Sequence, residues 1–405
     1  MRFDTIIIGG GLAGLTAGIR LQRKGRKTAI VSAGQNALHF SSGTFELLSR
    51  LPDGTPVDEP LKAVAQLPES HPYRKIARLP ELAAEVPAFF AEAGVTLRGD
   101  AGKNALRLTP TGSWKPFWLA MEDVDALEKA DIAGKKVLIV NLVGYLDFNT
   151  SFIADGLEKQ GAAVRIEALR LPEMERLREN PSEMRSVNIA RVMDNAWIKA
   201  ADEVKAHLQD EDIVILPQVF GLKDAAVPGR IREAVPAKVL FIGTMPPSVP
   251  GMRTQMQLKK AYEALGGTFL MGDEIRSAEL AEDAVQAVNA RNVGRMTAGN
   301  YILATGGFFS KGIAANMEQV FEPLFGLDVV SAEGRTAWYD PDFFKAQPFM
   351  DFGVATDAAF HPLKDGEPVK NLYAIGSVLA GAQALALGCG AGTAILTALS
   401  VADQL

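Results

Sequence analysis

Apolar runs and helical patterns alternate at the start of the chain. Residues 3–8 are rich in β-branched side chains, which is typical of a strand covered on both faces of a parallel sheet. Apolar residues at helical spacing over 12–24 predict a helix ending near Gly25. Residues 27–32 (KTAIVS) predict a second strand. The chain therefore begins with a βαβ unit of about thirty residues.

The rest of the chain shows the same two kinds of pattern. Apolar runs predict strands at residues 135–142, 164–168, 213–217, 238–242, 268–271, 301–304 and 372–375. Helical patterns predict helices at residues 45–51, 80–93, 152–160, 255–265 and 392–405. Strands that run directly into glycines stand near the two ends of the chain, and a central block of different character separates them.

A glycine motif follows the first strand. Gly9, Gly11 and Gly14 form a GxGxxG pattern between the predicted strand and helix. The first glycine permits a tight turn, the second lets the backbone approach a pyrophosphate, and the third lets the helix pack on the strand. The helix N-terminus then offers free N–H groups to the phosphates. The βαβ context makes dinucleotide or flavin binding the favoured interpretation over a structural turn.

The acidic residue that usually completes this motif is absent. It normally ends the second strand and binds the adenosine ribose. No Asp or Glu occurs between Asp4 and Glu46, and Ser32 stands in that position. A hydroxyl binds ribose more weakly than a carboxylate does.

Two further segments favour a flavin over a nicotinamide. Residues 300–307 (NYILATGG) predict a strand running into Thr305 and Gly306, where small residues let the chain pass close to a dinucleotide. Residues 371–376 (NLYAIG) lead through Gly376 to a glycine-rich turn and the last helix. In flavin enzymes the N–H groups of such a helix stabilise negative charge on the reduced flavin. The turn includes Gly388 and Gly390, which we expect to border the cofactor.

These signals predict an α/β fold with a Rossmann-like FAD/NAD(P)-binding parallel sheet. The sheet is discontinuous and carries an inserted α+β domain. We expect residues 1–50, 255–315 and 365–405 to form the flavin-binding domain. Residues 51–254 and 316–364 are then the inserted or cap region.

Composition narrows the classes of function. The 405 residues include 42 Lys and Arg against 48 Asp and Glu, a net charge of −6 that does not favour a nucleic-acid partner. The single cysteine, Cys389, excludes an internal disulfide framework and an iron–sulfur cluster held by this chain alone, and favours an intracellular protein. Residues 371–402 carry no charge, but their glycines predict a strand, a loop and a helix, so no direct membrane span is expected.

Several longer runs resemble a known family. They are residues 37–54, 185–195, 245–258, 342–348, 352–357 and 373–392. The chain is similar over nearly its whole length to the B subunit of bacterial anaerobic glycerol-3-phosphate dehydrogenase, in the two-dinucleotide-binding-domain flavoprotein group. The resemblance implies oxidation of sn-glycerol 3-phosphate to dihydroxyacetone phosphate. It also implies two partners: a flavoprotein, the A subunit of that enzyme, and an iron–sulfur protein, its C subunit, which anchors the complex on the inner face of the cell membrane and passes electrons to menaquinone.

The resemblance also bears on the flavin. It implies FMN, which needs no ribose anchor and so agrees with Ser32 in place of the acid. FAD is the alternative, because a serine still bonds ribose and a dinucleotide-type fold leaves room for adenine.

Residues after the second strand are candidates for flavin contact. In this flavoprotein group the chain turns towards the flavin ring there, and the segment HFSSG brings His39, Ser41, Ser42 and Gly43. The serines offer hydroxyl donors, and His39 is a candidate base. The alternative is a serine-rich turn in which His39 caps a helix.

Three arginines in the distinctive runs are candidates for a phosphorylated substrate. Arg suits a phosphate by its bidentate geometry. Arg185 and Arg191 are two of them, and Arg191 is equally explained by an interdomain ion pair. Arg253 is favoured because it follows a Pro-Pro-Ser-Val-Pro-Gly loop.

Cys389 stands at the predicted N-terminus of the last helix. That position suits a reactive thiolate of lowered pKa, and the alternative is a small buried residue beside the flavin. The histidines at 71, 207 and 361 lack ligand spacing, so no metal site is predicted.

Three functions remain open. The first is a flavoenzyme component of a quinone-dependent glycerol-3-phosphate dehydrogenase. The second is a non-catalytic electron-transfer or scaffold protein, with the alcohol oxidised on the flavoprotein partner. The third is a stand-alone flavoprotein of the fumarate-reductase type, against which four scattered histidines speak.

Overall fold

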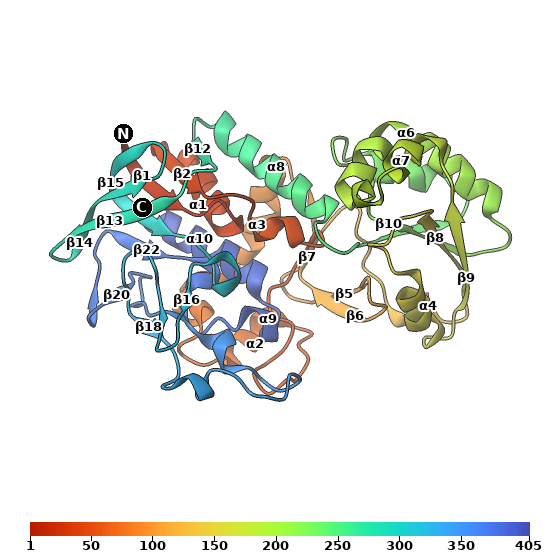
Figure 1. Cartoon of the computed structure of the whole chain (residues 1–405). Coiled ribbons are helices and arrows are strands. Elements are labelled where there is room, and N and C mark those ends of the chain that lie inside the picture. The colour runs from red at the N-terminus through yellow and green to blue at the C-terminus, as the bar shows by residue number, and fades with distance from the viewer.

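The computed structural model describes residues 1–405 and shows two bodies side by side (Figure 1). The larger body contains both termini and is built on a mixed sheet in the order β12-β2-β1-β15-β14-β13, with β22 also paired to β15. Its strands are β1 (Arg2–Ile8), β2 (Thr28–Ser32), β12 (Thr268–Met271), β13 (Ile275–Ala281), β14 (Ala284–Ala290), β15 (Gly294–Leu303) and β22 (Leu372–Ala374). This is the predicted Rossmann-like sheet, assembled from distant parts of the chain.

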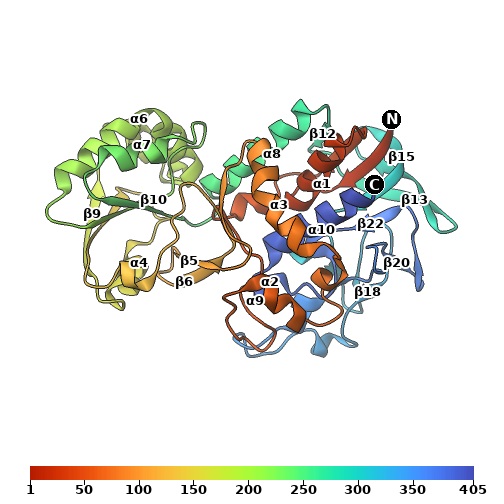
Figure 2. The ribbon, with the colours of Figure 1, turned by 180° about the vertical axis from the view of Figure 1, so that it is seen from behind.

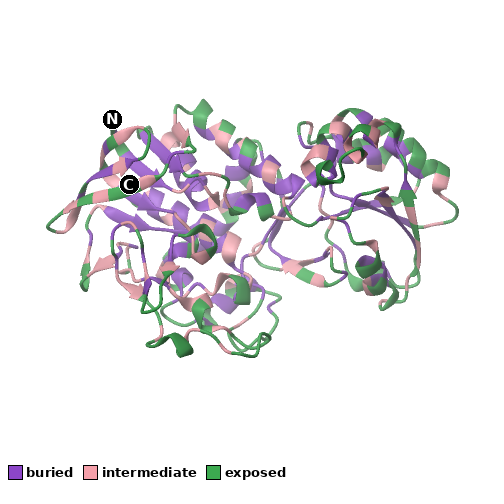
Figure 3. Ribbon diagram, in the orientation of Figure 1, coloured by how far each residue is buried: buried purple, intermediate pink, exposed green.

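The opening βαβ unit is confirmed. Helix α1 (Leu12–Arg23) connects β1 to β2, which run parallel with Thr5 opposite Thr28. β15 pairs in parallel with the other side of β1. The centre of the sheet is buried on both faces (Figure 3), which explains the uninterrupted apolar runs of these strands.

Helices from distant parts of the chain cover this sheet. They are α3 (Leu79–Glu92), α8 (Val249–Ala264) and α10 (Gly390–Gln404), and Figure 2 shows them from the opposite side. The guanidinium of Arg20 on α1 joins two of them, with Asp403 2.7 Å and Glu85 2.7 Å away. The uncharged stretch 371–402 forms β22, a loop, the short helix α9 (Ala384–Leu387) and most of α10, as predicted. No helix combines the length and the apolar character needed to cross a membrane.

The smaller body has its own four-stranded sheet, in the order β11-β10-β8-β9. The strands β8 (Lys136–Leu142), β9 (Ala163–Leu169), β10 (Ile213–Pro217) and β11 (Lys238–Ile242) are all parallel. The helices α4 (Thr150–Glu158), α6 (Ser186–His207) and α7 (Val227–Ala234) alternate with these strands along the chain. The insertion is therefore an α/β domain, and the predicted α+β class is wrong. Parallel pairing could not be deduced because the sequence pattern did not reveal α6 as a crossover helix.

The two bodies have separate hydrophobic cores. The larger core contains 65 buried residues and the smaller contains 36, which lie between Leu108 and Ile242. Val57 and Phe90, and Val320 and Phe360 farther along, belong to the larger core although they fall in the predicted cap region. We therefore propose a smaller insertion within the segment between Leu108 and Ile242, from which Trp118, Leu119 and Met121 still pack into the larger core.

Two local predictions are wrong. A short helix is predicted over residues 45–51, but Thr44–Phe45 form strand β3, which pairs with β7 (Leu119–Met121). Helix α8 begins at Val249, six residues before the predicted start. Pro250 is tolerated there because the first helical turn needs no internal N–H donor, and Ser248 caps the turn by accepting a bond from the N–H of Gly251 at 3.2 Å.

Candidate functional site

The glycine motif lies at the carboxyl end of β1, where α1 begins. A Cβ on Gly9 would lie 2.2 Å from the carbonyl oxygen of Ala304, and a Cβ on Gly14 would lie 1.9 Å from the oxygen of Gly9. Gly11 differs, because its nearest neighbour would be the Cβ of Asn36 at 3.9 Å. Gly9 and Gly14 therefore allow close packing, while open space lies beside Gly11. No side chain caps α1, so its first N–H groups remain available to a phosphate.

The end of β15 adds a second part of the same site. Its carboxyl end lies beside that of β1, because Leu303 is opposite Ile8. The hydroxyl oxygen of Thr305 is buried and has no hydrogen-bond partner. Gly306 and Gly376 have positive φ values of 78° and 74°, which few other residues adopt without strain. An orphaned hydroxyl and the open space beside Gly11 fit a phosphate-containing cofactor at these strand ends.

Ser32 has a local role that the sequence did not reveal. It ends β2, and its hydroxyl donates to the carbonyl oxygen of Gly34 at 3.1 Å. Asn36, which is not among the predicted site residues, donates from Nδ2 to the carbonyl oxygen of Gly10 at 2.7 Å. This bond ties the loop after β2 to the glycine motif. An asparagine after a strand carries no signal of its own that could have identified it.

The HFSSG segment is anchored against α8. The His39 ring bonds through Nε2 to the side-chain oxygen of Gln255, and Ser248 donates its hydroxyl to the carbonyl oxygen of Ser41. Gly43 has a φ of 80° and packs against Pro250. His39 is buried and lies inside the 3₁₀ turn Ala37–Phe40, which Asn36 caps, so His39 itself is not the cap. The Nδ1 atom of His39 is buried without a partner.

Cys389 lies between Gly388 and Gly390 at the start of α10, as predicted. Its side chain is fully buried, and burial raises the pKa of the Cys389 thiol to about 12. Desolvation therefore outweighs any effect of the helix N-terminus on this thiol. Burial therefore supports the small buried residue over the reactive thiolate, and its position beside the flavin stays a prediction.

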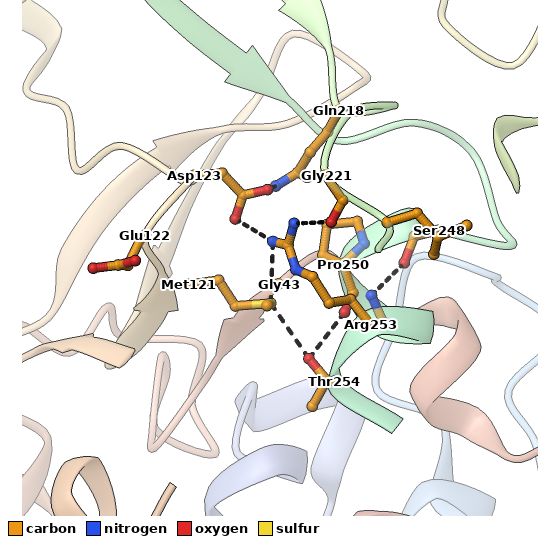
Figure 4. A network of polar contacts seen from close by, with 12 residues as sticks. Gly43, Met121, Glu122, Asp123, Gln218, Gly221, Ser248, Pro250, Arg253 and Thr254 are labelled. Carbon is orange, nitrogen blue, oxygen red and sulfur yellow. Dashed lines mark hydrogen bonds and ion pairs between the residues drawn. The ribbon is translucent and has the colours of Figure 1, made fainter. Parts of the chain in front are cut away.

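Arg253 does not lie on a loop as the sequence suggested. It lies on α8 and is 3% exposed. Its guanidinium bonds the carboxylate of Asp123 at 2.7 Å and the carbonyl oxygen of Gly221 at 2.8 Å (Figure 4). The geometry therefore favours a structural ion pair over direct substrate contact.

The other two candidate arginines lie on the smaller body. Arg185 pairs with Asp147 at 3.0 Å, and Arg191 donates to the side chain of Asn188 at 3.0 Å. Arg191 therefore bonds within its own helix and forms no interdomain ion pair. The structure does not bring these side chains together with Arg253.

A narrow pocket lies between the two bodies. Its polar lining includes Ser42, Arg107, Asp125 and Gln218. Arg107 and Gln218 are 7% and 2% exposed, yet neither belongs to a recognisable sequence motif. No group of three or more His, Cys, Asp or Glu side chains is arranged to hold a metal ion.

Comparison with known proteins identifies an FAD-binding family. Residues 4–393 match the family of FAD binding domains, which supports a flavin cofactor. In the solved structures, 3-ketosteroid delta1-dehydrogenase from Sterolibacterium denitrificans aligns over 100% of this chain and 99% of its own, at 12% identity and a TM-score of 0.46.

Curated relatives match along the full length. They are the B subunits of the anaerobic glycerol-3-phosphate dehydrogenases of Yersinia pseudotuberculosis, Pectobacterium carotovorum and Glaesserella parasuis, which are 41%, 43% and 36% identical to this chain. The alignments cover 100% of this chain and 98%, 99% and 99% of those proteins. The chain therefore belongs to the family of anaerobic glycerol-3-phosphate dehydrogenase B subunits, within the FAD-binding flavoproteins.

Proposed function

We propose that the chain is the FAD-containing component of a dehydrogenase complex that oxidises sn-glycerol 3-phosphate to dihydroxyacetone phosphate. The observation that carries the proposal is the full-length identity of 36–43% to proteins named as the B subunit of that enzyme. FAD replaces the FMN expected from the sequence, because the matching family binds FAD and spans residues 4–393. Ser32 in place of the acid does not exclude FAD, since other groups can hold ribose.

The residues that would hold FAD lie at adjoining strand ends. The N–H groups around Gly11 and the start of α1 would bind its phosphates, and Thr305 would supply a hydroxyl. We propose Ser41, Ser42, Gly306, Gly376, Gly388 and Gly390 as further neighbours of the flavin. When bound, the flavin supplies the hydride acceptor that oxidation of a secondary alcohol requires.

His39 is the proposed base for the substrate hydroxyl. Its Nε2 contacts the side-chain oxygen of Gln255, which can only accept, so Nε2 carries the hydrogen. The unpartnered Nδ1 then holds a free lone pair that can take a proton. Replacement of His39 with Asn should lower kcat far more than flavin content. A kcat equal to that of the unmodified chain would remove His39 from the chemistry.

Electrons must leave this chain for a partner, because one cysteine cannot ligate an iron–sulfur cluster. We propose that the partners are the flavoprotein and the iron–sulfur protein of the same enzyme, its A and C subunits, and that the complex reduces menaquinone. In this proposal the chain lies on the cytoplasmic face of the membrane and is held there by its partners.

The test combines cofactor identification with an activity assay. The chain is purified alone and with its native partners, the flavin released by denaturation is identified by mass spectrometry, and glycerol-3-phosphate-dependent dye reduction is measured for each preparation. Stoichiometric FAD and activity of the chain alone would support the proposal. Activity that requires the flavoprotein partner would instead favour the electron-transfer role if the FAD of this chain is reduced only through that partner, and the scaffold role if it is never reduced.

A further inference from the structure

The distinctive run DFFKAQP, residues 342–348, places two aromatic side chains in solvent. Phe343 and Phe344 lie between the short 3₁₀ turns η8 (Arg335–Ala337) and η9 (Pro348–Asp351). They are 84% and 94% exposed, and their rings meet edge to face with the centroids 5.6 Å apart. Contiguous large apolar side chains in water are typical of an interaction surface.

Hydrogen bonds inside the loop of residues 340–347 hold these two rings in place. The side-chain nitrogen of Gln347 donates to the carbonyl oxygens of Asp342 at 3.0 Å and Lys345 at 3.2 Å. The Gln347 Oε1 accepts from the N–H of Asp340 at 3.1 Å. The carboxylate of Asp342 accepts from the N–H of Phe344, also at 3.0 Å. A loop bonded in this way loses little conformational freedom on binding, so it is suited to place its rings in a pocket of another protein.

A row of aromatic side chains connects this loop to the proposed FAD site. The ring of Phe349, in η9, lies 6.3 Å from that of Phe308 in the turn η7 (Phe308–Ser310). Phe309 is 72% exposed and packs edge to face on Phe40 of the HFSSG segment at 5.2 Å. Phe308 stands two residues after Gly306 at the end of β15. A protein that covers this row therefore lies beside the strand ends proposed to hold FAD.

The charge around the loop indicates what kind of molecule covers it. Residues 308–351 contain seven Asp and Glu against three Lys and Arg, a net charge of −4 in a chain of net charge −6. Asp340 pairs with Lys345 at 3.8 Å, whereas the exposed Asp342 forms no ion pair. A second copy of this surface or an anionic membrane would be repelled. The charge therefore favours a different protein, with cations around an apolar pocket.

We propose that the loop of residues 340–347 docks the iron–sulfur partner of the dehydrogenase complex, with the rings of Phe343 and Phe344 in an apolar pocket of that partner. This partner is assigned because an electron acceptor must bind close to the flavin, and the aromatic row leads from the loop to the proposed FAD site. The inference rests on the proposed function and deepens it, since it gives the departing electrons a surface of this chain through which to leave.

The test measures binding of the flavin-loaded full chain to each purified partner by calorimetric titration. The double variant Phe343→Ser with Phe344→Ser should bind the iron–sulfur partner about a hundredfold more weakly, because exposed rings that become buried dominate such interfaces. Its flavin content and melting temperature should equal those of the unmodified chain. Leu146→Ser is the matched control, at a leucine of the smaller body that is 88% exposed, and should leave the affinity unchanged.

Asp342→Asn tests the charge separately. It retains the side-chain oxygen that accepts from the N–H of Phe344 and removes only the charge. Binding of the iron–sulfur partner should weaken severalfold at low salt, and the difference should shrink as salt is added.

Three results would overturn the inference. They are equal affinity of the double variant and the unmodified chain for the iron–sulfur partner, no binding of that partner by the unmodified chain, and a loss confined to the flavoprotein partner. Self-association of the unmodified chain, or its binding to vesicles containing phosphatidylglycerol, would overturn it too if the double variant abolished either. If the iron–sulfur partner binds through the loop but glycerol 3-phosphate never leads to its reduction, the docking surface stands and the proposed dehydrogenase function fails.

Discussion

Gly11 is the glycine of the motif that faces open space, and this makes it a clean test of cofactor binding. Its backbone φ is −79°, which any residue can adopt, and a Cβ there would meet only Asn36 at 3.9 Å. Gly11→Val should therefore fold normally without flavin and lose flavin retention, because the added methyls occupy the space for phosphate. The measurement is the ratio of flavin to protein absorbance after purification. Gly229→Val, at a glycine of α7 with open surroundings, is the control and should keep its flavin. Full flavin occupancy in Gly11→Val would remove this motif from the cofactor site.

The buried pair of Arg253 and Asp123 predicts a large but recoverable effect on stability. Arg253→Met should lower the free energy of unfolding by about 3–5 kcal/mol, because it leaves a carboxylate buried without its partner. The double variant Arg253→Met with Asp123→Asn should recover much of that loss. Denaturant titration of the three chains measures the difference. If the double variant is no more stable than the single one, the unpaired carboxylate is not the cause.

The thiol of Cys389 should be chemically inert in the folded chain. Because burial raises its pKa to about 12, it stays protonated at every pH at which the protein is handled. A thiol reagent at pH 8 should therefore label the folded chain very slowly and the denatured chain rapidly, at one equivalent per chain. Rapid labelling of the folded chain would show that this thiol is accessible.

Individual residues also show where sequence reasoning stops. The glycine motif was predictable because each glycine has a positional role in a strand–turn–helix unit. Arg107 and Gln218 could not be predicted from the sequence, because neither belongs to a motif. They become distinctive only after folding, which buries the Arg107 Nε and the Gln218 Oε1 without hydrogen-bond partners. Arg253 was predicted to contact the substrate, and its structural role could not be predicted because its carboxylate partner is 130 residues away along the chain.

At the scale of elements, the half-buried 3₁₀ turn η3 (Pro72–Lys75) predicts a pH effect. His71 caps this turn by accepting from the Tyr73 N–H at 3.1 Å, and burial lowers the pKa of His71 to about 4. The unfolded chain binds a proton near pH 6.5, whereas the folded chain resists it. The contribution of His71 to the free energy of unfolding is therefore fully present above about pH 6.5. It is lost as the pH falls towards 4, which lowers the free energy of unfolding by up to about 3 kcal/mol.

The variant His71→Asn isolates that contribution. Its side chain can still cap the turn but does not titrate. The drop in the free energy of unfolding from pH 7 to pH 4 should therefore be smaller for the variant than for the unmodified chain. If the free energies of unfolding of the two chains change in parallel with pH, another group dominates the loss of stability in acid.

Elements were predictable where one pattern dominated. The strands at 213–217, 238–242 and 268–271 match their observed bounds, because short apolar runs between turns leave few alternatives. Strands β13 and β14 were missed because they form a half-exposed antiparallel hairpin whose alternation is weak. The start of α8 was missed because its prolines suggested a loop.

At the scale of the whole molecule, the insertion was expected but its architecture was not. The strand order β11-β10-β8-β9 depends on which strands pair across long stretches of chain, and local periodicity carries no information on that. The segment 316–364 lies between β15 and β22 and packs into the larger core, although it adds no strand to the main sheet and so carries no signal that assigns it there.

Two separate cores predict two unfolding transitions. The larger core of 65 buried residues contains the proposed FAD site, and the smaller core of 36 lies on the other side of the interdomain pocket. A ligand stabilises only the unit that binds it, by about 2.7 kcal/mol at a hundred times its dissociation constant. In calorimetry of the flavin-free chain, added FAD should therefore raise the midpoint temperature of one unfolding transition and leave that of the other nearly unchanged. In a variant where Trp118 and Trp338 are both replaced by Phe, the remaining tryptophans, Trp114 and Trp197, pack against the smaller core, so their fluorescence identifies the unaffected transition. A single transition that moves as a whole with FAD would mean that contacts such as Arg253 with Asp123 couple the two bodies into one cooperative unit.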